Sequence, residues 1–113
     1  MEPMNELLQV AVLTTTVESA EDAQQLAQAA VQLRLAACAQ VEAIASHYVW
    51  QGQLSRCDEW RLVFKTLPCA VARLQHWLAA QHPYDVPQIL LRLEASSAPY
   101  MQWLRAQVDQ APD

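Results

Sequence analysis

Glycine is almost absent from this sequence of 113 residues, which contains only Gly52. Phosphate-binding loops and dinucleotide-binding turns need several glycines, because their backbone N–H groups must approach the phosphate oxygens closely. Neither motif can be built around one glycine. The composition therefore excludes these two kinds of nucleotide site.

Basic residues are also scarce, since Lys65 is the only lysine and the net charge is −5. Nucleic-acid binding depends on clustered lysine and arginine side chains that neutralise phosphates. The twelve acidic residues are dispersed along the chain, which is typical of a solvated surface. We expect no nucleic-acid partner.

No run of 18 apolar residues is present, so the sequence predicts no membrane-spanning helix. Residues 1–6 lack the basic start of a signal peptide. The three cysteines, Cys38, Cys57 and Cys69, are an odd number and form no C-x-x-C motif, which indicates reduced thiols. These features together predict a cytoplasmic protein without a membrane partner.

Hydrophobic residues, by contrast, are plentiful: they make up 53% of the chain and include four tryptophans. We expect a single domain over residues 1–113, with its core at about residues 7–108. Such a small monomer buries only roughly 65% of the surface of its unfolded chain. The apolar excess therefore favours an oligomer, whose interfaces would cover the surplus.

The first half of the chain predicts a strand, a helix and a long second strand. Residues 7–15 form a short apolar run with β-branched side chains, typical of a central strand. Ser19 stands three residues before Asp22, which is the spacing of a capping box, and predicts a helix that ends near Arg34. Residues 37–50 are long for a strand, and their apolar side chains change faces partway along, which predicts a bulge or a bend.

The second half predicts a hairpin, a second helix, a last strand and a terminal helix. Gly52 supplies the positive φ of a tight turn, and residues 59–66 return with clean alternation of apolar and charged side chains. Pro68 opens a helix that ends before Pro83, because the residue preceding a proline is pushed out of helical geometry. Residues 88–95 form the last strand.

The order β-α-β-β-α-β plus a terminal helix is that of the ferredoxin-like split β-α-β fold. This is an α+β class with one antiparallel sheet and helices on one of its faces. The other face is left bare by this chain, and the sheet has long free edges. Such a surface invites partner subunits.

Five stretches carry a family resemblance in the right order along the chain. They are LRLAACAQ after the first helix, SHYVWQGQL at the hairpin, EWRLVFKT on the returning strand, HPYDVPQIL, and PYMQWL in the last helix. Together they resemble the CutA family, the divalent-cation tolerance proteins. The likeness runs from about Val10 to Val108, which is nearly the whole chain.

The resemblance implies a ferredoxin-like homotrimer in the cytoplasm that binds copper or another divalent cation and supports metal tolerance. It brings no required cofactor and no enzymatic activity, and nothing in the sequence places a base beside a thiol. The hairpin strands of one subunit would extend the sheet of the next, resembling the PII signalling proteins. An alternative therefore stays open: a PII-like trimeric regulator that binds a small anion or a partner protein in clefts between subunits.

Some bacterial members of the family share a copper site built from a cysteine of the first strand and a His-His pair before Pro-Tyr. The resemblance puts Thr14 at the cysteine position and Gln81-His82 at the pair, with both positions near His82. His82 is the retained metal candidate, since a neutral imidazole suits Cu²⁺. The alternative is a histidine that ends the helix and is hydrogen-bonded to nearby groups.

A second set of candidates gathers aromatic and charged residues around the hairpin and the connection before the last strand. A lysine flanked by aromatic rings can hold a small anion in a cleft between subunits. The alternative is an interface salt bridge from Lys65 to Glu59 or Asp85 of a neighbouring subunit. The cleft and interface candidates are Tyr48, Trp50, Glu59, Lys65, Tyr84 and Asp85.

Overall fold

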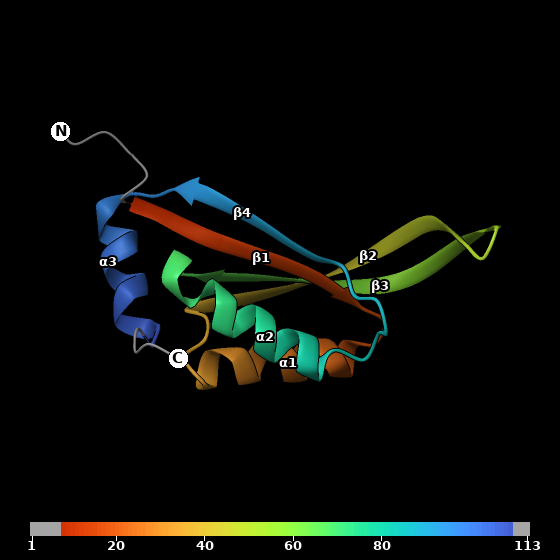
Figure 1. Ribbon diagram of the computed structural model, residues 1–113, viewed down its shortest axis with the longest axis horizontal. Coiled ribbons are helices and arrows are strands. Elements are labelled where there is room, and N and C mark those ends of the chain that lie inside the picture. Colours follow the sequence, from red (N-terminus) through yellow and green to blue (C-terminus); the bar gives the residue numbers. More distant parts are fainter. Residues whose placement is uncertain (1–7, 110–113) are drawn as a thin grey trace.

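The computed structural model describes residues 8–109, which form one four-stranded sheet with three α-helices (Figure 1). The strand order is β2-β3-β1-β4, and every neighbouring pair is antiparallel. The elements are β1 (Gln9–Val17), α1 (Ala20–Gln32), β2 (Cys38–Trp50), β3 (Gln53–Thr66), the 3-10 turn η2 (Pro68–Ala70), α2 (Val71–Gln81), β4 (Ile89–Ala95) and α3 (Ala98–Gln107). The ferredoxin-like prediction is confirmed, while the predictions made for residues 1–7 lie outside the described residues.

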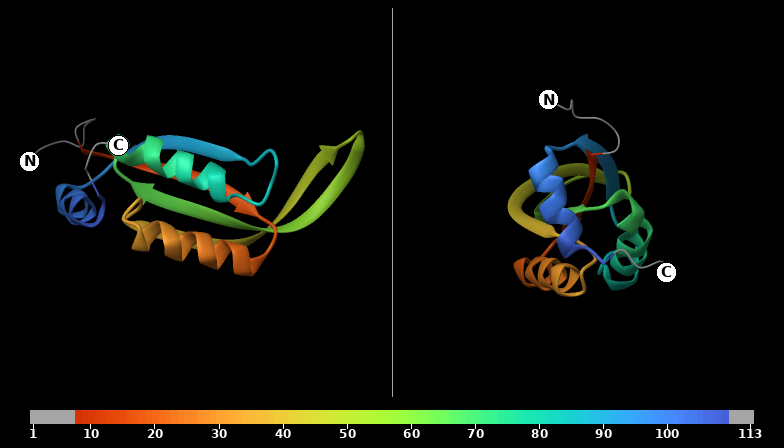
Figure 2. Two further views of the ribbon diagram at one scale, coloured as in Figure 1. Left: turned by 60° about the horizontal axis from the view of Figure 1, so that its bottom comes forward. Right: turned by 90° about the vertical axis from the view of Figure 1, so that its left-hand side faces the viewer.

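Helices α1 and α2 cover one face of the sheet, and the main core lies between them and the strands (Figures 1 and 2). Each fully buried leucine or phenylalanine contributes on the order of 2 kcal/mol to this layer. Helix α3 packs instead across the start of β1, where Val10 and Val12 meet Met101 and Leu104. The buried residues of the main core are Leu13, Val17, Ala23, Leu26, Ala27, Ala30, Ala36, Leu62, Phe64, Leu74 and Leu78.

Local signals set the ends of the helices. The Ser19 hydroxyl accepts a hydrogen bond from the Asp22 N–H at 3.0 Å, which confirms the predicted cap of α1. Arg34 adopts a left-handed φ of 60° just after α1, and its guanidinium donates to the carbonyls of Ala106 and Gln107 at the end of α3. Pro83 holds the preceding residue extended, and α2 ends there. None of the described helices is long and apolar enough to cross a bilayer.

Strands β2 and β3 form a hairpin that extends past the rest of the sheet. Residues 60–65 of β3 pair with β1 as well as β2, whereas residues 53–59 pair with β2 alone. We call this outer part, residues 44–59, the hairpin arm; Figure 2 shows it curving away from the body. Because the arm adds length at one end, the molecule measures 51 × 27 × 21 Å.

The change of faces in β2 comes with a bend but without a bulge. The register is unbroken from the Cys38–Lys65 pair to the Trp50–Gln53 pair, so no extra residue is inserted. Within the body, Val41 turns toward the helices; in the arm no helix remains, and Tyr48 and Trp50 lie on the opposite face. The apolar side chains of β2 therefore point toward the helices where helices cover the strand, and to the other face in the arm.

The hairpin turn is a two-residue loop, at the glycine where the sequence predicts a tight turn. Gln51 and Gly52 have φ values of 52° and 79°, so both central residues are left-handed, as in a type I′ turn. Strand β3 starts directly after this loop, six residues earlier than the prediction of 59–66. The prediction started later because apolar and charged side chains alternate cleanly only where β3 contacts the buried core.

Candidate functional site

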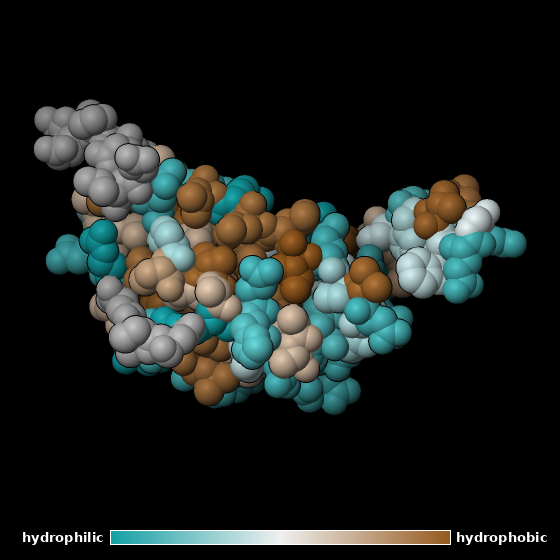
Figure 3. All heavy atoms as spheres, in the orientation of Figure 1, coloured by the Kyte–Doolittle hydropathy of each residue, from teal (hydrophilic) through white to brown (hydrophobic). Residues whose placement is uncertain are grey.

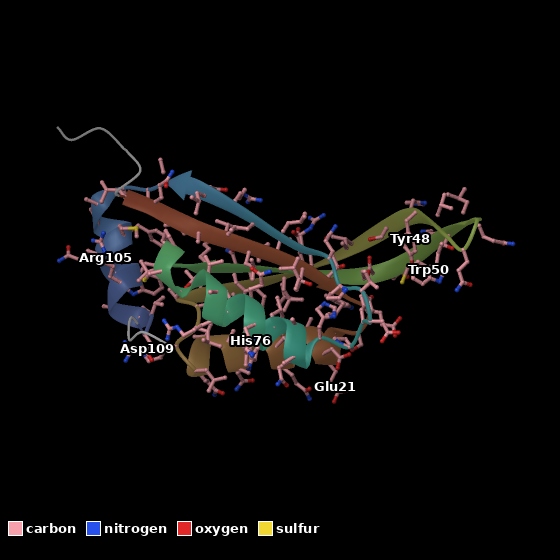
Figure 4. The ribbon with its side chains drawn as sticks, viewed as in Figure 1. Glu21, Tyr48, Trp50, His76, Arg105 and Asp109 are labelled. Atoms are coloured by element: carbon pink, nitrogen blue, oxygen red, sulfur yellow. The ribbon has the colours of Figure 1, made fainter. Side chains whose placement is uncertain are left out.

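A pocket of about 510 Å³ lies where the hairpin arm leaves the body, on the sheet face opposite α1 and α2. The arm contributes Tyr48 and Trp50, whose rings Figure 4 shows on its length. The 82–88 connection contributes Tyr84, Asp85 and the neighbouring Pro83 and Val86. We call this the hairpin-base pocket. It brings together five of the six predicted cleft residues: Tyr48, Trp50, Glu59, Tyr84 and Asp85.

The charge of the hairpin-base pocket has one sign. Glu18, Glu59 and Asp85 line it, and no lysine, arginine or histidine does. Glu59 is only 9% exposed, and its carboxylate accepts a hydrogen bond from the Tyr84 hydroxyl at 2.8 Å. Burial, reinforced by that carboxylate, raises the pKa of Tyr84, so its hydroxyl stays protonated and donates.

His82 holds the connection that carries Tyr84. Its Nδ1 accepts the backbone N–H of Tyr84 at 3.1 Å, so the proton of the neutral ring is on Nε2. Nε2 donates to the Thr15 hydroxyl at 2.9 Å, and that hydroxyl donates onward to the Gln88 carbonyl at 2.6 Å. These bonds join β1 to both ends of the connection and place Tyr84 against Glu59.

The environment of His82 disfavours its charged form. Burial lowers the pKa of His82, and the nearby Asp22 opposes this effect only in part. Protonation would also put a hydrogen on Nδ1, facing the Tyr84 N–H. The His82 ring therefore acts as a neutral structural link in this arrangement.

A metal ion does not fit the described part of this chain. A metal needs an imidazole lone pair, and the single lone pair of neutral His82 accepts from Tyr84. Across residues 8–109, no three His, Cys, Asp or Glu side chains come together as a metal-binding group. His76, labelled in Figure 4, lies on α2, away from the arm. Site geometry thus favours the helix-ending interpretation of His82.

Thr14 does not lie beside His82 within one chain, contrary to the expectation from the resemblance. Consecutive residues of a strand point to opposite faces. Thr15 points toward His82 and is fully buried, whereas Thr14 lines a hollow of about 620 Å³ on the bare face. Gln81 lines a third hollow, beside α1. The three positions of the expected copper site do not converge here.

Lys65 is the predicted cleft residue that the chain does not bring to the hairpin-base pocket. It lies on β3 six residues after Glu59, on the same face, which is about 20 Å along an antiparallel strand. There it lines a smaller hollow with Tyr100 and Glu94. The proposed pairing of Lys65 with Glu59 is therefore not an intrachain contact.

The described cysteines show no catalytic arrangement. Cys57 lines the hairpin-base pocket, but the thiol donates to the Asp58 carbonyl and no histidine lines that pocket. Cys38 and Cys57 are half-buried and Cys69 is exposed, and all three are free thiols. A thiol nucleophile needs a neighbouring base, which this pocket does not offer.

Sequence reasoning missed three residues of this region. Thr15 and Gln88 orient His82, and Glu18 adds a carboxylate to the pocket. No local pattern marks Thr15, because its role depends on the side chain 67 residues away that meets it. Glu18 directly precedes the Ser19 cap, a position from which a strand end turns into a helix.

The fold and the pocket define a class: an α+β protein of ferredoxin-like topology, with an acidic and aromatic pocket at the base of a long hairpin. The family model "CutA1 divalent ion tolerance protein" matches residues 11–107. This chain therefore belongs to the CutA family of divalent-ion tolerance proteins.

Individual relatives agree with this assignment. The divalent-cation tolerance protein CutA of Thermus thermophilus is 40% identical over 96 residues, covering 83% of this chain and 93% of the relative. A probable divalent-cation tolerance protein of Encephalitozoon cuniculi is 33% identical, covering 89% and 92%. The solved structure of CutA from Synechococcus elongatus is 42% identical with a TM-score of 0.89, and the match covers 95% of this chain and 96% of that one.

Proposed function

We propose that this protein is a non-catalytic homotrimer that contributes to divalent-cation tolerance in the cytoplasm. The observation that carries the proposal is membership of the tolerance family over residues 11–107, joined to a pocket without a nucleophile and base. The free thiols support the cytoplasmic setting.

The hairpin arm supports assembly. A two-stranded hairpin is only marginally stable alone in water, and the described part of this chain supplies no third strand to the arm. Exposed apolar side chains occur on the arm and along β4, and Figure 3 shows apolar surface on the arm as well as on the body. Among them are Trp50 at 59%, Leu54 at 81%, Leu90 at 57% and Leu91 at 52% exposed. Association would cover these side chains and extend the sheet.

Copper specificity has little support from the site. With His82 engaged by Tyr84 and Thr15, a soft-ligand site of high affinity is not present in the described chain. We infer that tolerance does not depend on tight storage of Cu²⁺ at His82. A role of the oligomer in metal handling is compatible with weak binding.

The alternative function, a PII-like regulator that binds a small anion between subunits, has a weaker basis in one chain. Three carboxylates line the hairpin-base pocket and would repel an anion. An anion would have to recruit basic side chains from another subunit. The charge therefore favours the tolerance function over anion sensing.

The test is growth of a bacterium that lacks its own CutA, carrying this gene or an empty plasmid, over graded Cu²⁺, Zn²⁺ and Co²⁺. The gene should raise the tolerated concentration of at least one ion. A matched variant, Leu90→Glu, should lose the effect if assembly is required, because it places a charge on an exposed apolar strand. Equal growth with gene and empty plasmid on all three ions would contradict the proposal.

A further inference from the structure

The hairpin-base pocket contains a buried carboxylate that has no cationic partner among residues 8–109. Glu59 is 9% exposed and accepts one hydrogen bond, from the uncharged Tyr84 hydroxyl. No basic side chain lines the pocket, and two further carboxylates, Glu18 and Asp85, do. A buried charge is costly unless an opposite charge compensates it. The pocket is electrostatically incomplete.

The same face of the sheet carries a lysine without a partner. Lys65 is half-buried, and its side chain has no hydrogen bond or ion pair among residues 8–109, whereas Arg34, Arg56, Arg61 and Arg92 each have one. Glu94, which lines the same hollow, is bonded to Arg92. Lys65 and Glu59 cannot meet within the chain, since about 20 Å of β3 separates them.

We propose that Lys65 of a second copy of this chain enters the hairpin-base pocket and pairs with Glu59. The pocket is then a site completed by the neighbouring subunit, and each subunit both gives a lysine and receives one. Any closed symmetric assembly satisfies this one-to-one count. The inference rests on the proposed oligomer and specifies which charges meet in its interface.

The walls of the pocket suit a lysine. The rings of Tyr48, Trp50 and Tyr84 provide apolar and cation–π surface for the methylene stem and the ammonium group. Trp50 and Tyr48 are 59% and 42% exposed in the single chain, so they have surface left to cover. Tyr84, fixed through His82, holds the Glu59 carboxylate in place for the incoming charge.

A second copy fits the surroundings better than a small organic cation. Exposed apolar side chains line the pocket itself, at Tyr48 and Trp50 on the arm and at Val86 on the connection. A small ligand would leave them in water, whereas a protein surface would cover them together with the pocket. Each copy also carries one unpaired Lys65, so the number of lysines equals the number of Glu59 carboxylates.

The test is subunit complementation with Lys65→Met and Glu59→Gln. Each variant alone leaves one charge buried without its partner and should raise the dissociation constant of the assembly at least about 100-fold. In an equimolar mixture, the first variant still has Glu59 and the second still has Lys65. The mixture should therefore assemble at lower concentrations than either variant, measured by light scattering over a dilution series.

The matched control is the Arg61–Glu42 pair, which lies on the same face of the sheet, on β3 and β2, and is bonded within one chain at 2.9 Å. Mixing Arg61→Met with Glu42→Gln should restore nothing, because both halves of an intrachain pair must be in one molecule. Circular dichroism of each variant verifies that it is folded; if Lys65→Met or Glu59→Gln is not folded alone, recovery of folded assembly on mixing is the same readout.

Three outcomes would overturn the pairing. The first is a mixture that assembles no better than its components. The second is Glu94→Gln reproducing the effect of Lys65→Met, which would assign Lys65 to its own chain. The third is wild-type assembly of Lys65→Met together with tetramethylammonium binding that Glu59→Gln abolishes, which would assign the pocket to a small cation. A parent protein that stays monomeric would instead refute the proposed oligomer itself.

Discussion

At the scale of single residues, the chemistry of this protein depends on which hydrogen-bonding groups each side chain has already engaged. His82 is a metal ligand by residue type, yet its two ring nitrogens are bonded to Tyr84 and Thr15. Its neutral ring aligns the connection, and through Tyr84 it supports the buried Glu59.

The pH dependence of stability should contain a contribution from His82. Because burial lowers the pKa of His82 below the unfolded value of 6.5, the unfolded chain takes up the proton first. The stabilising contribution of the neutral ring is fully present above pH 6.5 and is lost as the pH falls below it. The decrease in melting temperature from about pH 7.5 to about pH 5 should therefore be smaller in His82→Gln than in the parent.

His76→Gln serves as the control for that measurement, since His76 is exposed on α2. The control should keep the parent's pH dependence. Equal slopes for parent and His82→Gln would show that His82 is not buried neutral in the native state.

Copper binding tests which residue of β1, Thr14 or Thr15, points toward His82. The parent should bind Cu²⁺ no tighter than about micromolar, on the order of −8 kcal/mol, and His82→Ala should change this little. Thr15→Cys combined with Gln81→His should strengthen binding at least about tenfold, because a thiol at position 15 lies beside the His82 ring. Calorimetry measures both.

The neighbouring threonine provides the matched variant. Thr14→Cys combined with Gln81→His adds the same two ligands, but position 14 faces the bare side of the sheet. It should bind Cu²⁺ like the parent. Stronger binding by this variant than by the Thr15 variant would mean that copper is held between subunits.

At the scale of elements, the hairpin arm is the distinctive feature of the molecule. Its strands stay in register from the body to the turn, although they have no third strand and no covering helix in the described chain. The turn must therefore be favourable by itself, and both of its central residues are left-handed. Glycine tolerates this conformation, whereas a β-branched side chain does so only under strain.

Replacing Gly52 by valine should destabilise the arm by about 1–2 kcal/mol. An added Cβ at Gly52 meets no atom within 4 Å, so the cost would come from the backbone conformation and not from a clash. Gly52→Asn should cost less, because asparagine adopts positive φ more readily. Amide hydrogen exchange of Val49 and Leu54, with the melting temperature, measures the effect. Unchanged exchange in Gly52→Val would be incompatible with a left-handed φ at this position.

At the scale of the whole molecule, the sheet has one face covered by α1 and α2 and one face largely open, with apolar residues on the β4 edge and the arm. Apolar side chains exposed in this way are typical of a subunit whose interface is uncovered in the single chain. On the open face, Arg61 and Glu42 pair with each other, whereas Glu59 and Lys65 have no oppositely charged partner in the described part of the chain.

The native mass should be three times 12.7 kDa by light scattering after size exclusion at micromolar concentration. Leu90→Glu should reduce it by placing a charge among exposed apolar groups, whereas Gln75→Glu on the exposed side of α2 should not. A monomeric parent, or equal loss in both variants, would contradict assembly through the open face and β4.

Much of the fold was determined by local sequence. The capping spacing of Ser19 and Asp22, the stop at Pro83 and the single glycine at the turn each act within a few residues, and the structure confirms all three. The aromatic and acidic residues of the pocket were also recognisable, because the hairpin and the 82–88 connection concentrate them in two short stretches.

What those residues can bind depends on contacts between distant parts of the chain. Whether Thr14 or Thr15 meets His82 depends on the parity of β1 in the sheet, and a shift of one residue exchanges the two faces. The separation of Lys65 from Glu59 depends likewise on the extended, unbroken pairing of the inner strand β3. Sequence alone determined which groups are available; contacts between residues far apart in the chain determined which of them are engaged and which face a partner, because burial and register are properties of the assembled sheet.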